Sequence, residues 1–368
     1  MAELLKNIYN DLFFQRLGES IEKVVPAFEK EKFTKEIFNK GWAEKELKQR
    51  MRHVTLTLHS QLSSDYKENI KVLLELIPVL LDDGFKKDGL EFIFLPDYVE
   101  VFGQDDFETS MFAIKEITQF VTCEFAIRPF IIEHQIAVIS HLYNWSNHPN
   151  EDVRRLASEG CRPRLPWSVA LPYLKKNPIT ILPILDNLKN DPSEYVRRSV
   201  ANSLNDIAKD NPQIVVKLAK RWKGKTEQTD KLIKHACRSL LKEGNPELME
   251  LFGFGSIAEV GIENFEIATP QVKIGDYLNF AFNLANKSEQ KSLLRLEYGL
   301  YFKKANGSLS KKVFKISEKE YEGKTTSLIS RKQSFKLITT RKFHLGEHRI
   351  ALIINGKELE SYSFELIN

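Results

Sequence analysis

Residues 157–167 read Ala-Ser-Glu-Gly-Cys-Arg-Pro-Arg-Leu-Pro-Trp, and this stretch decides how the surrounding chain is organised. An amphipathic helix that begins near Pro149 is expected to end at Gly160, because the Arg-Pro-Arg-Leu-Pro run cannot continue a helix. The chain then presents an indole at Trp167. One helix end therefore carries a carboxylate, two guanidinium groups and a large aromatic face. Core packing does not require this mixture, whereas a site for a cationic, phosphate-bearing ligand does.

The residues before this stretch recur farther along the chain. The motif Asn-x-Pro-x-x-x-Val-Arg-Arg occupies residues 147–155 and returns at 190–198, displaced by 43 residues, with a fainter third copy at 232–236. Apolar residues keep helical spacing up to about residue 252. Repeats of about 40 residues with one helix pair each are typical of HEAT-like solenoids. We therefore predict a mainly α, HEAT-like helical-repeat domain over residues 1–252.

Beyond residue 252 the pattern changes from helical spacing to alternation. Glycines at 253 and 255 indicate a hinge, expected at 253–258. Turns at Asn306-Gly307 and Asn355-Gly356 separate alternating segments. About seven strands are predicted, at 272–274, 278–284, 294–302, 311–316, 334–338, 348–354 and 359–366. Their size and rhythm predict a small all-β, immunoglobulin-like sandwich at 259–368.

Composition excludes several classes of protein. Of 368 residues, 42% are apolar and 28% charged, as in ordinary globular proteins. No run approaches the ~18 apolar residues of a membrane span, and the N-terminus lacks the features of a secretory signal. The three cysteines are far apart, which disfavours disulfides, zinc and iron–sulfur clusters. We therefore expect a cytoplasmic protein with no membrane partner and no metal.

Positive charge is concentrated around the opening stretch. Residues 151–238 hold 18 Lys and Arg against 10 Asp and Glu, whereas residues 1–150 hold 17 against 24. Such a local excess is typical of phosphate binding. The alternative is a solvated basic face with no partner.

Two helices of the repeat should place polar side chains on a common face. On a helical wheel the packing face of the first is Val153, Leu156 and Ala157. The opposite side carries Arg155, Glu159 and Arg162. In the next repeat the packing residues are Val196, Ser199, Val200 and Ile207, and the polar stripe is Arg198, Asn202 and Asp206. Stacking in register predicts Arg155 beside Arg198 and Glu159 beside Asn202. From periodicity alone, ordinary surface helices with i, i+4 ion pairs are the better account.

Taken whole, residues 157–167 closely resemble the signature of AlkC-type alkylpurine DNA glycosylases. Thr122–Phe130 (Thr-Cys-Glu-Phe-Ala-Ile-Arg-Pro-Phe) and Val196–Asp206 also look like that family, in the right order. The resemblance covers about residues 1–250, and the sandwich corresponds to the longer form of the family. It implies a helical-repeat enzyme that excises N3-alkylated bases such as 3-methyladenine. It also implies bent DNA with the lesion largely stacked, so we expect no deep, purine-sized apolar pocket near Trp167.

The resemblance and the chemistry together indicate three acids. An N3-alkylated purine is cationic and departs as a neutral base, so the enzyme must stabilise an oxocarbenium-like sugar and position a water. A carboxylate about 4 Å from that cation contributes about 4 kcal/mol at an effective dielectric near 20, or roughly three decades in rate. Glu159 and Asp206 are the first candidates and Glu124 is the third. The alternative for Glu124 is an acid favoured by a helix dipole.

Aromatic and basic residues complete the predicted site. Trp167, with Phe125, is expected to contact the lesion, where a cation–π contact contributes about 0.5–2 kcal/mol. The alternative for Trp167 is a core residue fixed by Pro166. The candidates for phosphate binding are Arg155, Arg162, Arg164, Arg197 and Arg198. Of these, Arg197 lies nearer the repeat flank and also suits a structural role.

The leading hypothesis is a monofunctional DNA glycosylase that uses no cofactor and no metal. Its partner is double-stranded DNA containing alkylated bases, and we expect a monomer. No lysine in the matching segments stands out as a Schiff-base nucleophile, so no lyase step is expected. The alternatives are a non-catalytic HEAT-repeat scaffold that binds DNA and one that binds another protein.

Overall fold

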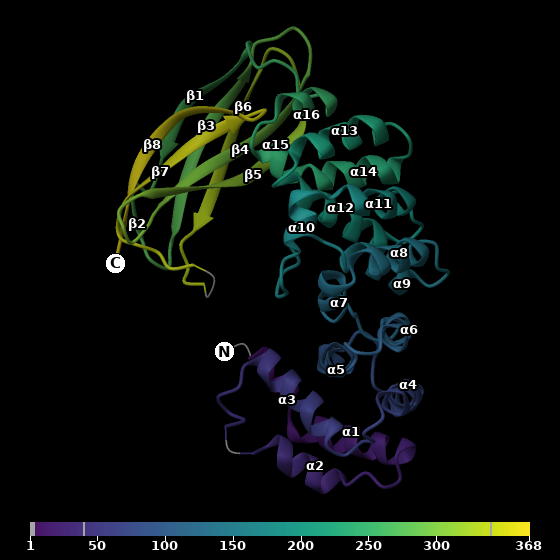
Figure 1. The fold of residues 1–368 in the computed structure, drawn as a ribbon. Coiled ribbons are helices and arrows are strands. Elements are labelled where there is room, and N and C mark those ends of the chain that lie inside the picture. Colours follow the sequence, from purple (N-terminus) through teal and green to yellow (C-terminus); the bar gives the residue numbers. More distant parts are fainter. Residues whose placement is uncertain (1–3, 40, 339–340) are drawn as a thin grey trace. The chain divides into compact units, whose positions relative to one another are not determined.

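The computed structural model describes residues 4–39, 41–338 and 341–368. Over these residues the chain forms sixteen α-helices followed by eight β-strands (Figure 1). They fall into two compact units. One comprises the chain up to Asn211 together with Lys223–Ala236, and the other comprises Pro212–Trp222 and Cys237–Asn368. None of the described helices combines the length and the apolar composition needed to cross a bilayer.

The first unit is a stack of helices that follow one another in chain order (Figure 1). Its α-helices are α1 (Asp11–Val24), α2 (Lys30–Ile37), α3 (Leu47–His59), α4 (Tyr66–Asp82), α5 (Phe94–Phe102), α6 (Phe107–Ile117), α7 (Ile127–Glu133), α8 (Gln135–Trp145), α9 (Glu151–Glu159), α10 (Pro172–Lys176), α11 (Leu182–Leu188), α12 (Glu194–Ala208) and α14 (Glu227–Ala236). Three 3₁₀ segments join them, η1 (Leu5–Ile8), η2 (Leu90–Phe92) and η3 (Ile179–Ile181). Helix α9 packs on α8, α11 and α12, and α12 packs on α14. The predicted HEAT-like stack is confirmed.

Helix α9 has a clear beginning. The side chain of Asn150 accepts a hydrogen bond from the main-chain N–H of Asp152, which caps the first turn. The predicted packing face, Val153, Leu156 and Ala157, is fully buried. The helix is therefore held by its apolar stripe against its neighbours, and its other residues are available for polar contacts.

Helix α9 ends at Glu159, as the sequence predicts, and Gly160 explains why the chain can turn there. A Cβ atom on Gly160 would lie 2.9 Å from both Ile127 Cγ2 and the carbonyl oxygen of Leu156. Only glycine lets the end of α9 approach α7 this closely. Pro163 then prevents a further helical turn.

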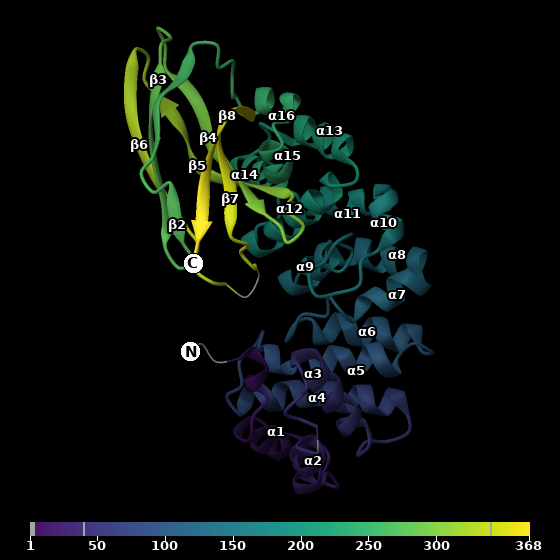
Figure 2. The same cartoon turned by 90° about the vertical axis from the view of Figure 1, so that its left-hand side faces the viewer.

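The second unit contains three helices and a β-sandwich. The helices are α13 (Pro212–Trp222), α15 (Arg238–Lys242) and α16 (Pro246–Leu251). The strands are β1 (Val260–Ile267), β2 (Gln271–Lys273), β3 (Tyr277–Asn286), β4 (Ser292–Lys303), β5 (Leu309–Tyr321), β6 (Thr325–Ser334), β7 (Gly346–Ile354) and β8 (Lys357–Ile367). They form two sheets, in the orders β1-β3-β6 and β2-β8-β7-β4-β5. The sheets lie face to face (Figure 2), and inward residues such as Phe280, Leu300 and Ile350 form the core.

The sandwich is confirmed, but two of its strands differ from the prediction. Strand β1 was not expected, because a bulge between Glu263 and Glu266 breaks its alternation. The strand expected at 334–338 is wrong, and β6 occupies Thr325–Ser334 instead. Strand β6 is an edge strand rich in Ser and Thr, its Leu328 is exposed, and of its residues only Ile329 joins the apolar core, so its apolar alternation is weak. The hinge expected at 253–258 stays a prediction, and α16 and β1 on either side of it belong to the same unit.

Candidate active site

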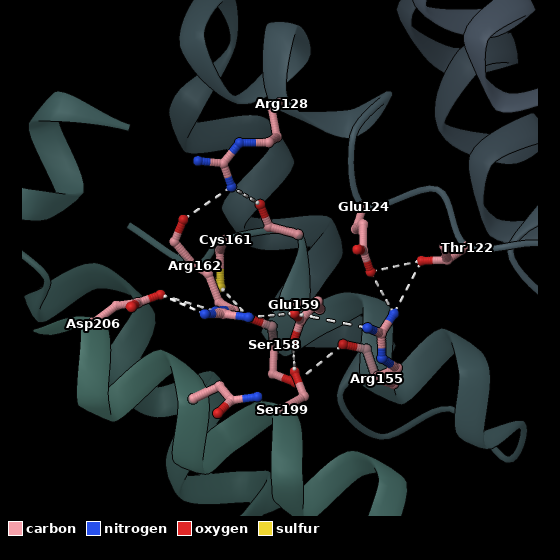
Figure 3. Close-up of polar contacts among 12 residues, drawn as sticks. Thr122, Glu124, Arg128, Arg155, Ser158, Glu159, Cys161, Arg162, Ser199 and Asp206 are labelled. Atoms are coloured by element: carbon pink, nitrogen blue, oxygen red, sulfur yellow. Dashed lines mark hydrogen bonds and ion pairs between the residues drawn. The ribbon is translucent and has the colours of Figure 1, made fainter. Parts of the chain in front are cut away.

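Three segments of the first unit bring acidic and basic side chains into one row (Figure 3). They are the loop before α7, the end of α9 with its following loop, and α12. Side chains of opposite charge alternate in this row, which we term the charge ladder: Glu124, Arg155, Glu159, Arg162 and Asp206. The sequence predicts all five residues as site residues, and the structure places them together.

The contacts within the charge ladder are short. Arg155 Nη1 donates to Glu124 Oε2 at 2.6 Å, and its Nη2 lies 3.7 Å from Glu159 Oε1. Arg162 Nη1 donates to Glu159 Oε1 at 2.6 Å, and its Nε donates to Asp206 Oδ2 at 2.9 Å. Each arginine therefore lies between two acids. This arrangement lets three carboxylates converge without uncompensated repulsion.

The charge ladder is largely buried. Glu159 is 5% exposed and Asp206 is 2% exposed, while Glu124 is the most accessible acid. Burial disfavours the charge on Arg162, but Glu159 and Asp206 outweigh it and raise the pKa of Arg162 above its ordinary value. Charges in such surroundings interact more strongly than they would at the surface.

Hydroxyl groups orient two of the acids. Ser199 Oγ in α12 donates to Glu159 Oε2 at 2.6 Å, and Thr122 Oγ1 donates to Glu124 Oε2 at 2.9 Å. Ser158 Oγ lies 2.7 Å from Ser199 Oγ. Both oxygens of Glu159 are therefore engaged, one by arginine and one by serine, and its carboxylate has a single defined orientation.

The register between α9 and α12 differs from the prediction. Glu159 contacts Ser199, and the Arg155 guanidinium lies 4.7 Å from the centre of the Tyr195 ring. Both contacts span 40 residues, whereas the sequence repeat is 43. Arg155 therefore lies against Tyr195, about one helical turn before the expected Arg198, while the expected pairing of Glu159 with Asn202 stays a prediction.

Trp167 lies on the surface. Its side chain is 64% exposed, so the alternative of a core tryptophan is wrong. Its φ angle is +64°, in the left-handed region that bulky side chains rarely adopt. The main-chain oxygen of Trp167 accepts a hydrogen bond from Lys48 Nζ of α3. The indole is thus presented to solvent by a loop with an unusual backbone.

A hollow of about 390 Å³ lies beside Trp167. Its lining is Lys48, Glu100, Phe125, Pro129 and 167–169. Lys48, Glu100 and Phe125 also line a second hollow of about 610 Å³ along α3 and α5. The volume falls in the ~300–1,000 Å³ range of small-molecule sites, but the walls mix charges with rings. The hollow is large enough for a purine and its lining is more apolar than polar, so the expectation of no purine-sized apolar pocket near Trp167 is not met.

Phe125 and Glu124 are adjacent in the chain and have different surroundings. Phe125 faces both hollows, and Lys48 Nζ lies 4.6 Å from the centre of its ring. Glu124 belongs to the charge ladder. It precedes Ala126, the N-cap of α7, and its carboxylate bonds to Arg155 and Thr122. The helix-dipole account of Glu124 therefore does not explain its main contacts.

The five candidate arginines fall into three groups. Arg155 and Arg162 are engaged within the charge ladder. Arg164 is partly exposed and is held by Asp210 through two hydrogen bonds of 2.9 and 2.6 Å. Arg197 donates to the main-chain oxygens of residues 191 and 192, and Arg198 is largely exposed beside Glu194. Arg198 and Arg164 are therefore the most available to an external phosphate.

Sequence reasoning missed three residues that shape the site. Lys48 lies 119 residues from its partner Trp167, and no local pattern marks it. Arg128 lies within the Thr122–Phe130 match and donates to three carbonyl groups around the loop after α9. Ser199 was expected only to pack inwards. Of these, Arg128 alone carried a sequence signal, as an arginine beside a proline in a matching segment.

Potential metal ligands do not cluster in the part of the chain that the structure describes. Within the described ranges, no group of three or more His, Cys, Asp or Glu side chains is arranged to hold a metal ion. The three cysteines, Cys123, Cys161 and Cys237, are buried and separate. The chemistry available at the site is therefore that of carboxylates, guanidinium groups, hydroxyls and aromatic rings.

Comparison with known proteins agrees with this architecture. Residues 261–368 match the family described as the C-terminal Ig-like domain of the uncharacterised protein YhaZ, and residues 181–210 match the HEAT repeat. The uncharacterized protein YhaZ of Bacillus subtilis is 41% identical over 366 residues, covering 100% of both chains. The structure of Pseudomonas fluorescens alkylpurine DNA glycosylase AlkC, bound to DNA containing an abasic site analog, superposes with a TM-score of 0.94 at 37% identity and covers 100% of both chains. The chain therefore belongs to the AlkC-type alkylpurine DNA glycosylase family, in the form that carries a C-terminal immunoglobulin-like domain.

Proposed function

We propose that this protein is a monofunctional DNA repair glycosylase. It hydrolyses the N-glycosidic bond of cationic N3-alkylated bases, with 3-methyladenine the first substrate. The observation that carries the proposal is the charge ladder, in which three acids from separate segments converge on Arg155 and Arg162. The similar AlkC protein was solved bound to DNA containing an abasic site analog, which supports duplex DNA as the partner.

Two rings at the hollow, the exposed Trp167 and the half-buried Phe125, account for selection of a charged base. Trp167 and Phe125 both line the hollow of about 390 Å³, and their faces attract a cationic ring more strongly than a neutral one. The contribution of about 0.5–2 kcal/mol corresponds to a preference of a few-fold to about thirtyfold. Glu100 also lines the hollow, and its negative charge offsets the positive charge of Lys48 in the same lining.

The acids stabilise the sugar cation and orient the attacking water. Glu124 Oε2 takes both hydrogen bonds found for this carboxylate, so its Oε1 is the oxygen best placed to accept from water. Asp206 Oδ2 is held by Arg162, and its Oδ1 accepts from the exposed Lys209 at 3.2 Å. Glu159 is engaged at both oxygens and contributes charge in a fixed orientation. A cationic purine leaves as a neutral base, so its departure needs no general acid. The charge ladder agrees with this chemistry, because none of its five side chains is a free proton donor.

The arginines divide between internal and external roles. Arg155 and Arg162 hold the acids, so their effect on DNA binding is indirect. Arg164 and Arg198 remain for phosphate contacts, whereas Arg197 bonds to main-chain oxygens. Each phosphate contact adds about one unit to the salt dependence of binding.

The direct test is release of 3-methyladenine from methylated duplex DNA under single-turnover conditions. Asp206→Asn, Glu159→Gln and Glu124→Gln should each reduce the rate by about 100-fold or more, because each removes a charge near the developing cation. Asp191→Asn is the matched control, since Asp191 is buried like Asp206 and also pairs with an arginine. Its partner is Arg154 of the preceding repeat. Activity that survives all three site variants would overturn the proposal and favour a non-catalytic scaffold.

Strand integrity tests the monofunctional assignment. The product should be an intact strand with an abasic site, and borohydride should trap no covalent complex. Lys48 lies at the hollow, so Lys48→Met is included. If borohydride traps a covalent complex with the wild type but not with Lys48→Met, the protein acts by a lyase mechanism through Lys48, and the monofunctional assignment is wrong.

A further inference from the structure

Trp167 has a strained backbone that its own side chain does not explain. Its φ of +64° costs a bulky residue on the order of 1–3 kcal/mol. Within the described part of the chain, the indole makes no ring-stacking or cation–π contact, and most of it faces solvent. Such a conformation persists only where surrounding groups hold it. Contacts to the main chain must therefore fix the position of Trp167.

Arg128 supplies contacts on both sides of Trp167. Its Nη1 donates to the carbonyl oxygens of Gly160 and Arg162, at 3.1 and 2.9 Å, and its Nε donates to that of Val169 at 2.7 Å. The two ends of the loop are thereby joined through one guanidinium group. Figure 3 shows Arg128 reaching toward this loop from the helix above it.

Arg128 is an unusual residue to bury. It is 0% exposed, it forms no ion pair among the described residues, and its Nη2 has no hydrogen-bond partner there. Burial lowers the pKa of Arg128 to about 10, so the group still carries its charge at neutral pH. Burying a guanidinium against neutral carbonyls is costly. Its three bonds to one loop indicate that it serves the geometry of that loop.

Lys48 supplies the contact to Trp167 itself. Its ammonium group donates to the main-chain oxygen of Trp167 and lies 4.6 Å from the centre of the Phe125 ring. The two aromatic residues at the hollow are therefore connected through one side chain of α3. Arg128 and Lys48 reach the loop from different helices, α7 and α3.

We infer that Arg128 and Lys48 are positioning residues that hold Trp167 in its strained conformation before any ligand binds. The indole is thus preset in the free protein, and binding does not have to order it. The consequence for catalysis rests on the proposed function. The presetting itself does not, because it concerns the protein without DNA.

The test is ¹⁹F NMR of the full chain labelled with 5-fluorotryptophan. The protein has four tryptophans, and Trp42, Trp145 and Trp222 are buried, so Trp167→Phe assigns the exposed resonance. In the wild type this resonance should be a single narrow line. Arg128→Met and Lys48→Met should each broaden, split or shift it and leave the other three in place. Lys48→Arg, which keeps a donor, should restore the line.

Arg16→Met is the matched control, because Arg16 also donates to a carbonyl oxygen, that of Asp83, away from the loop. It should leave the Trp167 resonance unchanged. If Arg128→Met does not fold, the Trp167 resonance is compared between the wild type, Arg128→Lys and Lys48→Met. A Trp167 resonance that is the same in wild type, Arg128→Lys and Lys48→Met overturns the inference.

The kinetic readout separates this inference from the proposed function. If the wild type releases 3-methyladenine, Lys48→Met should lower the single-turnover rate by up to about 100-fold through misplacement of the indole. The same variant should lower binding to undamaged duplex DNA by less than threefold. If the wild type releases no base, the proposed function fails, while the NMR result still decides the positioning role.

Discussion

Arg162 joins Asp206 to Glu159 across the boundary between two repeats. Its Nε donates to Asp206 Oδ2 at 2.9 Å, and its Nη1 donates to Glu159 Oε1 at 2.6 Å. Both acids are almost excluded from water. Removing the guanidinium takes from two buried carboxylates the counter-charge that they share, and leaves only the longer contacts of Glu159 with Arg155 and of Asp206 with Lys209. We expect Arg162→Met to lower the free energy of unfolding by about 3–5 kcal/mol, measured by urea denaturation.

A double-mutant cycle shows whether that loss comes from the pair. Arg162→Met combined with Asp206→Asn should cost less than the sum of the single changes, by more than about 0.5 kcal/mol. The exposed pair of Arg198 and Glu194 is the control, and its coupling should be about 0.5 kcal/mol or less. Additive losses at Arg162 and Asp206 would mean that the charge ladder does not act as a unit.

Arg197 and Arg198 are adjacent in the chain but have different surroundings. Arg197 donates to main-chain oxygens at the start of its own repeat, whereas the Arg198 side chain is 67% exposed. We expect Arg198→Ala to reduce the slope of log Kd against log salt concentration by about one unit, because it removes a phosphate contact. The measurement is fluorescence anisotropy on duplex DNA at several salt concentrations.

Arg197→Ala provides the contrast. It should lower the free energy of unfolding by about 1–3 kcal/mol, since two carbonyl groups lose their donor. The salt slope should not change. Equal slope changes in the two variants would assign Arg197 to the DNA contact surface as well.

Asp210 restrains Arg164 at neutral pH. The hydrogen bonds from Arg164 lower the pKa of Asp210 below its ordinary value of 3.8. A lowered folded-state pKa means that the pair is intact above the ordinary value and is lost only as the pH falls through the lowered one. Asp210→Asn removes the negative charge and frees Arg164 for phosphate. We expect tighter DNA binding and a salt slope steeper by up to about one unit.

The control for Asp210→Asn is Asp230→Asn. Asp230 is similarly exposed, pairs with Lys223 and lies in the same unit, so its change adds the same net charge. It should alter DNA affinity far less. Equal effects would show that only the overall charge matters, and that Arg164 does not contact phosphate.

Much of the fold, and the end of α9 at the candidate site, could be predicted from local sequence. The end of α9 before Gly160 follows from a proline four residues beyond the helix and a glycine that permits close approach to α7. The repeat and the sandwich follow from periodicity. These features depend on neighbours in the chain, where the sequence carries its strongest signals.

The remaining features depend on distances that no local pattern fixes. The 40-residue offset between Glu159 and Ser199 depends on how α9 packs on α12. The contact between Lys48 and Trp167 spans 119 residues. A helical wheel also places Glu159 and Arg162 at the surface, whereas the next repeat covers them. Sequence could name the acids and arginines, but their pairing required the fold.

The turn between β7 and β8 touches the turn between α15 and α16 within the second unit. Gly356 and Gly244 have φ angles of +77° and +76°, and a Cβ atom on Gly356 would lie 2.4 Å from Gly244 Cα. Asn355 Nδ2 also donates to the carbonyl oxygen of Gly255 at 3.1 Å. The last helices and the sandwich are thereby joined on either side of residues 253–258, and we expect them to unfold together.

Gly356→Ala tests this joint against a matched glycine. Gly307 has a φ of +79° in the turn between β4 and β5, and a Cβ atom there would meet nothing within 4 Å. Gly307→Ala should cost only the backbone strain, about 1–2 kcal/mol. Gly356→Ala adds a clash with Gly244, so urea denaturation should show a further loss of about 1–3 kcal/mol. Equal losses at the two positions would mean that the sandwich moves freely on the last helices, as a flexible hinge at 253–258 requires.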